Sequence, residues 1–339
     1  MRSDAGYKRE RRLTLSGFPN IVFTLLICSA CWMTGYNYSI GYPLPGGETT
    51  AFLWEAIRRI LPAEINYLYL TGFCLLCLGA ALLQRFNFIF TIIKAKTTLP
   101  FLLFLLLNST NPDLFPVRPV SFVLFLLMFA IFELFRSYQN PDAVNRMFNM
   151  MVYLGTGSLI WPHLLLFIPV FFVGMYIFRI WNVRSLAASL LGLFTVCWFV
   201  LGWCIMKHDY AVFINLIQCL SDIRFFITQE SWLIERLAPL CTFLLMIIVY
   251  IQISILEHEN TIRTRHFLSW LLIFGVVAFV LSLVYTSGFD DFLYVFYLSV
   301  TFILSYFFSG KYGITTSLFY FLFMILLILV FFIRLWNFL

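Results

Sequence analysis

Long apolar runs alternate with short polar gaps along this chain, and the runs are continuous. A helix needs roughly 20 apolar residues to cross a hydrocarbon core of about 30 Å, because backbone groups in lipid must bond within their own segment. The pattern predicts transmembrane helices, since the strands of a membrane barrel alternate residue by residue. We place about eleven crossings at 21–38, 65–83, 99–110, 120–135, 147–160, 162–178, 186–206, 237–256, 267–285, 292–308 and 314–333.

Two of these segments, 99–110 and 147–160, are too short to cross alone at 1.5 Å per residue. They are either re-entrant or buried within the bundle. A third apolar stretch, 87–93, is shorter still, and we expect it to lie flat at the cytoplasmic surface. The predicted fold is an all-α, polytopic membrane helix bundle with about eleven transmembrane or re-entrant helices.

The composition agrees with a lipid environment. Hydrophobic residues make up 62% of the 339 residues and charged residues 11%, whereas a soluble domain carries roughly 25% charged residues. No polar gap is long enough for a soluble domain. We therefore divide the chain into a basic segment, 1–20, and a single transmembrane domain, 21–339.

The gaps differ in charge, and this difference predicts the orientation. We count the segment before the first crossing as gap one. Lys and Arg are about twice as frequent in the odd-numbered gaps as in the even-numbered ones, so the positive-inside rule places the N-terminus in the cytoplasm and the C-terminus outside. A multi-pass protein of the bacterial inner membrane is expected. The net charge of +6 is explained by juxtamembrane residues that meet anionic lipid headgroups, and not by nucleic-acid binding.

The two longest loops, 39–64 and 207–236, both lie on the predicted outer face. Each contains apolar residues at helical spacing, at 48–61 and at 211–226. Such segments are typical of helices that lie in the membrane interface. They serve either as structural caps or as substrate-facing lids.

Several kinds of chemistry have no support in the sequence. The two C-x-x-C spacings, Cys28 with Cys31 and Cys74 with Cys77, lie in apolar runs where residues i and i+3 share a helix face, so we interpret them as packing and expect neither metal nor cofactor. No ionisable residue falls at the middle of a predicted crossing, which argues against ion-coupled transport. A phosphate-binding loop of the GxxxxGK[ST] type is also missing from the sequence.

Acidic and polar residues of the chain gather on the predicted outer face, and Asp290 and Asp291 are among them. There a carboxylate could act as a base while an arginine holds a lipid phosphate. The alternative is a set of solvated loop residues that end helices. The candidate site residues are Glu48 as the catalytic acid or base, and Glu55, Asn111, Asp113, Arg118 and His163 as substrate-binding residues.

The stretch from 87 to about 201 contains several motifs, LPFLLFLLLN at 99–108, PDLF at 112–115, NPDA at 140–143, LGTGSLIWP at 154–162 and FR at 178–179. With these motifs the stretch resembles a family of uncharacterised polytopic inner-membrane proteins of the Bacteroidota. That resemblance implies a location in the inner membrane and no particular activity.

A more distant resemblance is to the C-type glycosyltransferases, which use polyprenyl-phosphate sugars. It rests on an acidic first outer loop and on a later hairpin with Gly155, Gly157, Pro162 and Arg179. The resemblance implies that Glu48 takes the place of the catalytic acid. Those enzymes usually carry an acidic pair containing Asp in this loop, so a degenerate enzyme is an open alternative.

Three functions remain open from the sequence. The first is an inner-membrane protein of cell-envelope biogenesis, or a subunit of a membrane complex with a membrane-protein partner. The second is a glycosyltransferase that uses a lipid-linked sugar. The third is a transporter or flippase of a lipid-linked substrate. All three place membrane lipids among the partners.

Overall fold

The computed structural model describes residues 18–39, 51–62, 64–93, 97–208, 211–221, 232–256, 261–285, 288–309 and 313–337. All elements in these ranges are helical. They are α1 (Phe18–Ser39), α2 (Phe52–Ile60), α3 (Ile65–Phe90), α4 (Leu99–Ser109), η1 (Pro112–Leu114), α5 (Pro119–Arg136), α6 (Val144–Ser158), η2 (Pro162–Phe167), α7 (Ile168–Ile177), α8 (Val183–Lys207), α9 (Ala211–Ser221), α10 (Trp232–Leu256), α11 (Ile262–Val284), α12 (Phe289–Phe308) and α13 (Gly313–Asn337).

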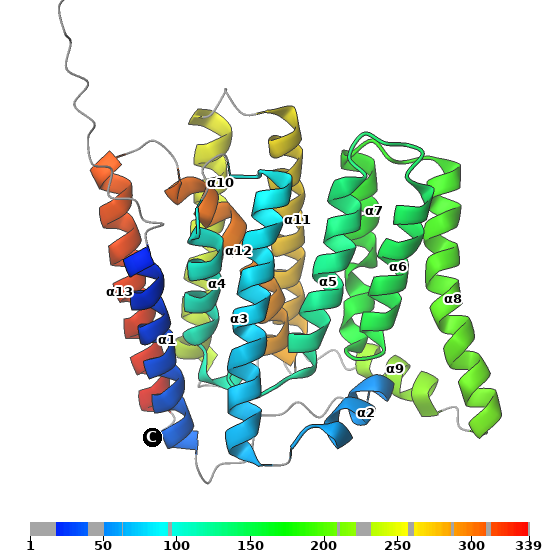
Figure 1. Ribbon diagram of the computed structural model, residues 1–339, viewed down its shortest axis with the longest axis horizontal. Coiled ribbons are helices and arrows are strands. Elements are labelled where there is room, and N and C mark those ends of the chain that lie inside the picture. Colours follow the sequence, from blue (N-terminus) through cyan, green and yellow to red (C-terminus); the bar gives the residue numbers. More distant parts are fainter. Residues whose placement is uncertain are drawn as a thin grey trace, which may run out of the picture.

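The all-α, polytopic bundle is confirmed. Among the described residues, seven helices are long and apolar enough to cross a membrane, and each predicted crossing coincides with a helix. The long helices run between two ends of the bundle, while α2 and α9 lie across one end (Figure 1). We call this the α2/α9 end. The C-terminus of α13 lies at the α2/α9 end and α1 begins at the opposite one, as the predicted odd number of crossings requires.

Helix α4 belongs to the interior of the bundle. It packs against α1, α3 and α12, and ten of its eleven residues are buried. Eleven residues rise only about 16 Å, so α4 does not cross the hydrocarbon core alone, and η1 continues the chain toward the α2/α9 end. Burial among longer helices removes the need for a full-length apolar span.

The expectation that 87–93 forms a separate segment at the surface is wrong, because α3 continues through Phe90. The rings of Phe86 and Phe90 lie 5.2 and 5.6 Å from that of Phe135 on α5, which holds this end of α3 in the bundle. The helix then ends at Thr91, which has a positive φ of 48°. The Asn87 side chain accepts a hydrogen bond from the Ile93 backbone, at 3.0 Å.

Helix α12 forms the centre of the bundle. In the apolar stretch of α12 that is long enough to cross a membrane, 94% of the residues are buried, the highest share among the seven long helices. It packs against α4, α10 and α11. Its first turn carries Asp290 and Asp291 and lies at the α2/α9 end. The most enclosed helix therefore places two carboxylates beside the loop between α4 and α5.

Candidate functional site

Arg118 is placed by the start of α5. It is the residue before Pro119, has an extended backbone and precedes the first helical turn. Proline suits this first position because it has no backbone N–H to satisfy. The Arg118 side chain is only 4% exposed and turns toward the first turn of α12.

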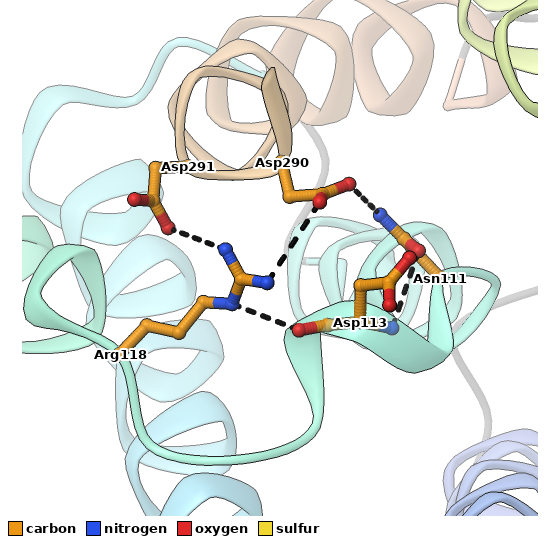
Figure 2. Close-up of polar contacts among 5 residues, drawn as sticks. All are labelled: Asn111, Asp113, Arg118, Asp290 and Asp291. Atoms are coloured by element: carbon orange, nitrogen blue, oxygen red, sulfur yellow. Dashed lines mark hydrogen bonds and ion pairs between the residues drawn. The ribbon is translucent and has the colours of Figure 1, made fainter. Parts of the chain in front are cut away.

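The Arg118 guanidinium connects the start of α5 to η1, which is close in sequence, and to the first turn of α12, which is distant in sequence (Figure 2). One terminal nitrogen donates to the Asp291 carboxylate at 3.1 Å, and the other lies 3.7 Å from the Asp290 carboxylate. Its Nε donates to the Asp113 backbone carbonyl at 2.8 Å. All three nitrogens therefore have partners within the chain.

Asn111 completes this network from the beginning of η1. Its Nδ2 donates to the Asp290 carboxylate at 2.6 Å, while its Oδ1 accepts from the Asp113 backbone N–H at 3.3 Å. The second contact caps η1, as the Asn-Pro-Asp turn favours. The network thus fastens η1 and the start of α5 to α12.

The electrostatics keep Arg118 charged. Burial alone would lower the pKa of the guanidinium, but the carboxylates of Asp291, Asp290 and Asp113 raise it above its ordinary value. Buried charges persist in proteins when they are paired and hydrogen-bonded in this way. The arrangement is typical of a structural ion network, because the guanidinium is already engaged by neighbouring helices.

His163 lies in η2, in an aromatic environment. Its ring centroid is 5.0 Å from Tyr285, 5.4 Å from Phe292 and 5.7 Å from Trp161. The Tyr285 hydroxyl in turn donates to the Leu220 backbone carbonyl of α9, at 2.8 Å. His163 therefore belongs to the packing between η2, α9 and the start of α12.

The candidate site residues do not form one site. Asn111, Asp113 and Arg118 lie together with the two carboxylates of α12. Glu55 lies elsewhere, on the exposed side of α2. Glu48 lies outside the described residues.

A groove lies between α2, α8 and α9 at the α2/α9 end. It has a volume of about 940 Å³, and its walls are largely apolar, with Phe52, Phe199 and Trp203 among the lining residues. Three charged side chains, Glu55, Arg59 and Lys207, also line it. A cationic, partly apolar groove at a membrane surface suits a ligand with an anionic group and a hydrocarbon part.

Local packing fixes the orientation of α2 over this groove. The Leu53 backbone N–H donates to the Leu159 carbonyl at 3.0 Å, and Trp54 is buried. Leu53 and Trp54 thus hold one side of the helix. Glu55 and Arg59 are four residues apart and so share a helix face, and both face the groove.

The opposite wall of the groove is built by the end of α8. The Lys207 ammonium lies 5.6 Å from the Trp203 ring centroid, and the Phe52 ring meets Trp203 edge to face at 6.2 Å. Cation–π contacts of this kind orient a lysine side chain. The cation is therefore held at the groove wall.

A second, apolar groove of about 440 Å³ runs between α6 and α8. It shares Leu159, Phe199 and Val200 with the first groove, so the two lie side by side. Its only polar residues are Thr156 and Thr195, whose hydroxyls donate to backbone carbonyls of their own helices at 2.8 and 2.7 Å. These hydrogen bonds occupy the hydroxyl protons and leave the groove wall essentially hydrocarbon.

The sequence predicted helices at α2 and α9 but not the grooves. The residues that line the grooves come from four helices, and no spacing along the chain relates these residues to one another. One signal was present, because Arg59 and Lys207 are cations on the face where the positive-inside rule expects few.

No metal centre competes with the grooves as a candidate site in the part of the chain that the structure describes. No group of three His, Cys, Asp or Glu side chains there could hold a metal ion. Comparison with known proteins gave no match to a family model, to a curated protein or to a solved structure.

Proposed function

We propose that this multi-pass membrane protein binds a lipid-linked substrate with an anionic headgroup, and that it works in cell-envelope biogenesis. The observation that carries the proposal is the groove between α2, α8 and α9, where Arg59 and Lys207 meet an apolar wall. On the orientation predicted from the sequence, this groove opens at the outer membrane surface.

The arrangement of charge supports a phosphate headgroup. Arg offers paired N–H donors to phosphate oxygens and Lys offers a compact positive charge, and both strengthen contacts to an anion. Helices α2 and α9 lie across the bundle axis, as helices at the headgroup level of a membrane do. Trp203 adds an aromatic side chain of the kind enriched at that level.

The test compares a polyprenyl phosphate with the polyprenyl alcohol of the same chain length, both bound to the full chain in nanodiscs. This pair isolates the contribution of the phosphate. A charge-assisted hydrogen bond contributes about 1.5–3 kcal/mol, which corresponds to roughly 10- to 100-fold in Kd. We expect Arg59→Gln and Lys207→Gln each to reduce the preference for the phosphate by about that factor.

Arg58→Gln is the matched control, because Arg58 is an exposed neighbour on α2 that does not line the groove. It should leave the preference for the phosphate unchanged. Equal binding of phosphate and alcohol by the unmodified protein would refute the proposal, as would an equal effect of Arg58→Gln and Arg59→Gln.

A second candidate function, glycosyl transfer, is favoured by one observation. Glu55 lines the same groove as Arg59, one helical turn before it. A carboxylate there could accept the proton of an acceptor hydroxyl as its oxygen attacks the sugar, while the bond from the sugar to the lipid phosphate breaks and the lipid phosphate leaves. Glu48 is the alternative base that the family resemblance implies.

The glutamates are tested separately. Glu55→Gln and Glu48→Gln are assayed for transfer from a polyprenyl-phosphate sugar, and lipid binding is measured in parallel. Loss of transfer with binding retained in one variant identifies the base. If the unmodified protein binds the donor but produces no transfer product, the function is binding or transport without glycosyl transfer.

A further inference from the structure

The apolar groove between α6 and α8 has the dimensions of a binding site for a hydrocarbon chain. Its α6 wall is formed by Phe148, Val152 and Thr156, which lie four residues apart and form one stripe. Eight residues of helix rise about 12 Å. This length is close to the thickness of one membrane leaflet, about half of a 30 Å hydrocarbon core.

Close helix contacts fix the width of this groove. A Cβ on Gly192 of α8 would lie 2.4 Å from the Phe148 carbonyl oxygen, and a Cβ on Gly155 of α6 would lie 3.1 Å from Val196. At Gly192 the two helices therefore meet almost backbone to backbone, and at Gly155 the Val196 side chain lies directly against the α6 backbone. A groove whose walls are already packed needs little ordering when a ligand enters, which favours binding.

The two grooves adjoin at the end of α6. Leu159, Phe199 and Val200 line both, so the charged groove and the apolar one adjoin over these three side chains. In Figure 1, α6 and α8 are neighbours and α2 and α9 lie below them. An anionic group at Arg59 and Lys207 would have its hydrocarbon chain directed along α6 and α8.

We infer that the α6/α8 groove holds one hydrocarbon chain of the lipid whose phosphate binds Arg59 and Lys207, and that the lipid enters sideways from the leaflet. This inference rests on the proposed function. The wall on α6 is a single stripe of side chains, which suits one chain. Because the groove lies on the surface of the bundle and not in its core, entry requires no separation of helices.

The first experiment measures affinity against chain length with single-chain alkyl phosphates. We expect the affinity of the full chain in nanodiscs to rise with chain length and to level off once the chain exceeds the groove. Val152→Trp and Thr195→Phe fill the groove from opposite walls. Each should weaken binding of the long-chain phosphate about tenfold, a discrimination typical of shape in an apolar pocket, and leave a short-chain phosphate unaffected.

Cys197→Trp is the matched control, since Cys197 is exposed on α8 and does not line the groove. Retention of the short-chain phosphate by Val152→Trp and Thr195→Phe establishes that these variants are folded. If Cys197→Trp weakens long-chain binding as strongly as they do, the inference is refuted.

A second experiment locates the chain directly. An alkyl phosphate that carries a diazirine in its tail is photolysed with the protein, and the labelled residues are mapped by mass spectrometry. We expect labels on the α6 and α8 groove residues. Labels spread evenly over the lipid-facing helices would overturn the inference. If the preference for phosphate over alcohol survives in that case, the proposed function stands and only the location of the chain is wrong.

Discussion

The ion pair between Arg118 and Asp291 should dominate the stability of the α2/α9 end. Its two side chains are 4% and 6% exposed, and their terminal atoms are 3.1 Å apart. Arg118→Met removes the cation and leaves the Asp291 carboxylate buried next to Asp290. Loss of one partner of a buried pair costs about 3–5 kcal/mol, so we expect a decrease of that size in the free energy of unfolding.

The structure also predicts the order of the effects. Asp290 is 24% exposed, lies 3.7 Å from Arg118 and accepts a hydrogen bond from Asn111. The amide oxygen of an Asn at this position can accept the same hydrogen bond. Asp290→Asn should therefore cost only about 1 kcal/mol, as a partly exposed pair does. The double variant Arg118→Met with Asp291→Leu removes both buried charges and should regain most of the loss, because apolar pairs replace buried ion pairs well.

The assay is unfolding in mixed micelles by titration with SDS, followed by far-UV circular dichroism. Arg58→Met serves as the control, since Arg58 is exposed on α2. Two results would show that the reasoning is wrong. One is a loss for Asp290→Asn as large as that for Arg118→Met. The other is a double variant whose loss is the sum of its single losses.

Three further predictions concern packing, topology and the η1 turn. Gly192→Ala places a Cβ against the Phe148 carbonyl and should lower the free energy of unfolding by about 1–3 kcal/mol, the usual cost of overpacking; an unchanged unfolding curve contradicts the close contact. In a cysteine-free protein, Arg59→Cys should react with an impermeant maleimide in intact cells and Arg146→Cys only after lysis; the reverse pattern inverts the predicted orientation. Asn111→Ala removes a hydrogen bond to the Asp290 carboxylate and should lose about 1.5–3 kcal/mol in the same SDS titration, and a loss larger than that of Arg118→Met contradicts its peripheral place in the network.

The helices were predictable because lipid imposes a length and an apolar composition on each crossing. Even α4 and α6 were located, and their shortness indicated that each is either re-entrant or buried within the bundle; burial is confirmed for α4. The pattern cannot say which helices are neighbours, since every apolar run satisfies the same requirement. Arg118 and Asp291 are 173 residues apart, and only the packing of α5 against α12 brings them together.

The meeting of polar residues was predicted in part, while their role in substrate binding stays a prediction. The polar residues around Asn111 and Arg118 do meet Asp290 and Asp291, as their common location on one face suggested. Their mutual pairing was not predictable, because the sequence does not reveal whether an arginine faces a carboxylate or solvent. The grooves were also hidden, since they depend on how closely α6, α8 and α2 approach one another. Gly155 and Gly192 control that approach for α6 and α8, and nothing in the sequence indicated that these two glycines face each other's helix.

The central position of α12 has a consequence for biosynthesis. Among the seven long helices it is the most buried, and with α3 it is one of the two least hydrophobic, at a mean hydropathy of 1.6. Its buried hydroxyl residues Ser299, Thr301 and Ser305 would face lipid if it entered the membrane alone. Its packing neighbours α4, α10 and α11 all precede it in the chain, so they can already be in the membrane when it is synthesised. The order of the sequence therefore provides α12 with a protein environment at the moment of its insertion.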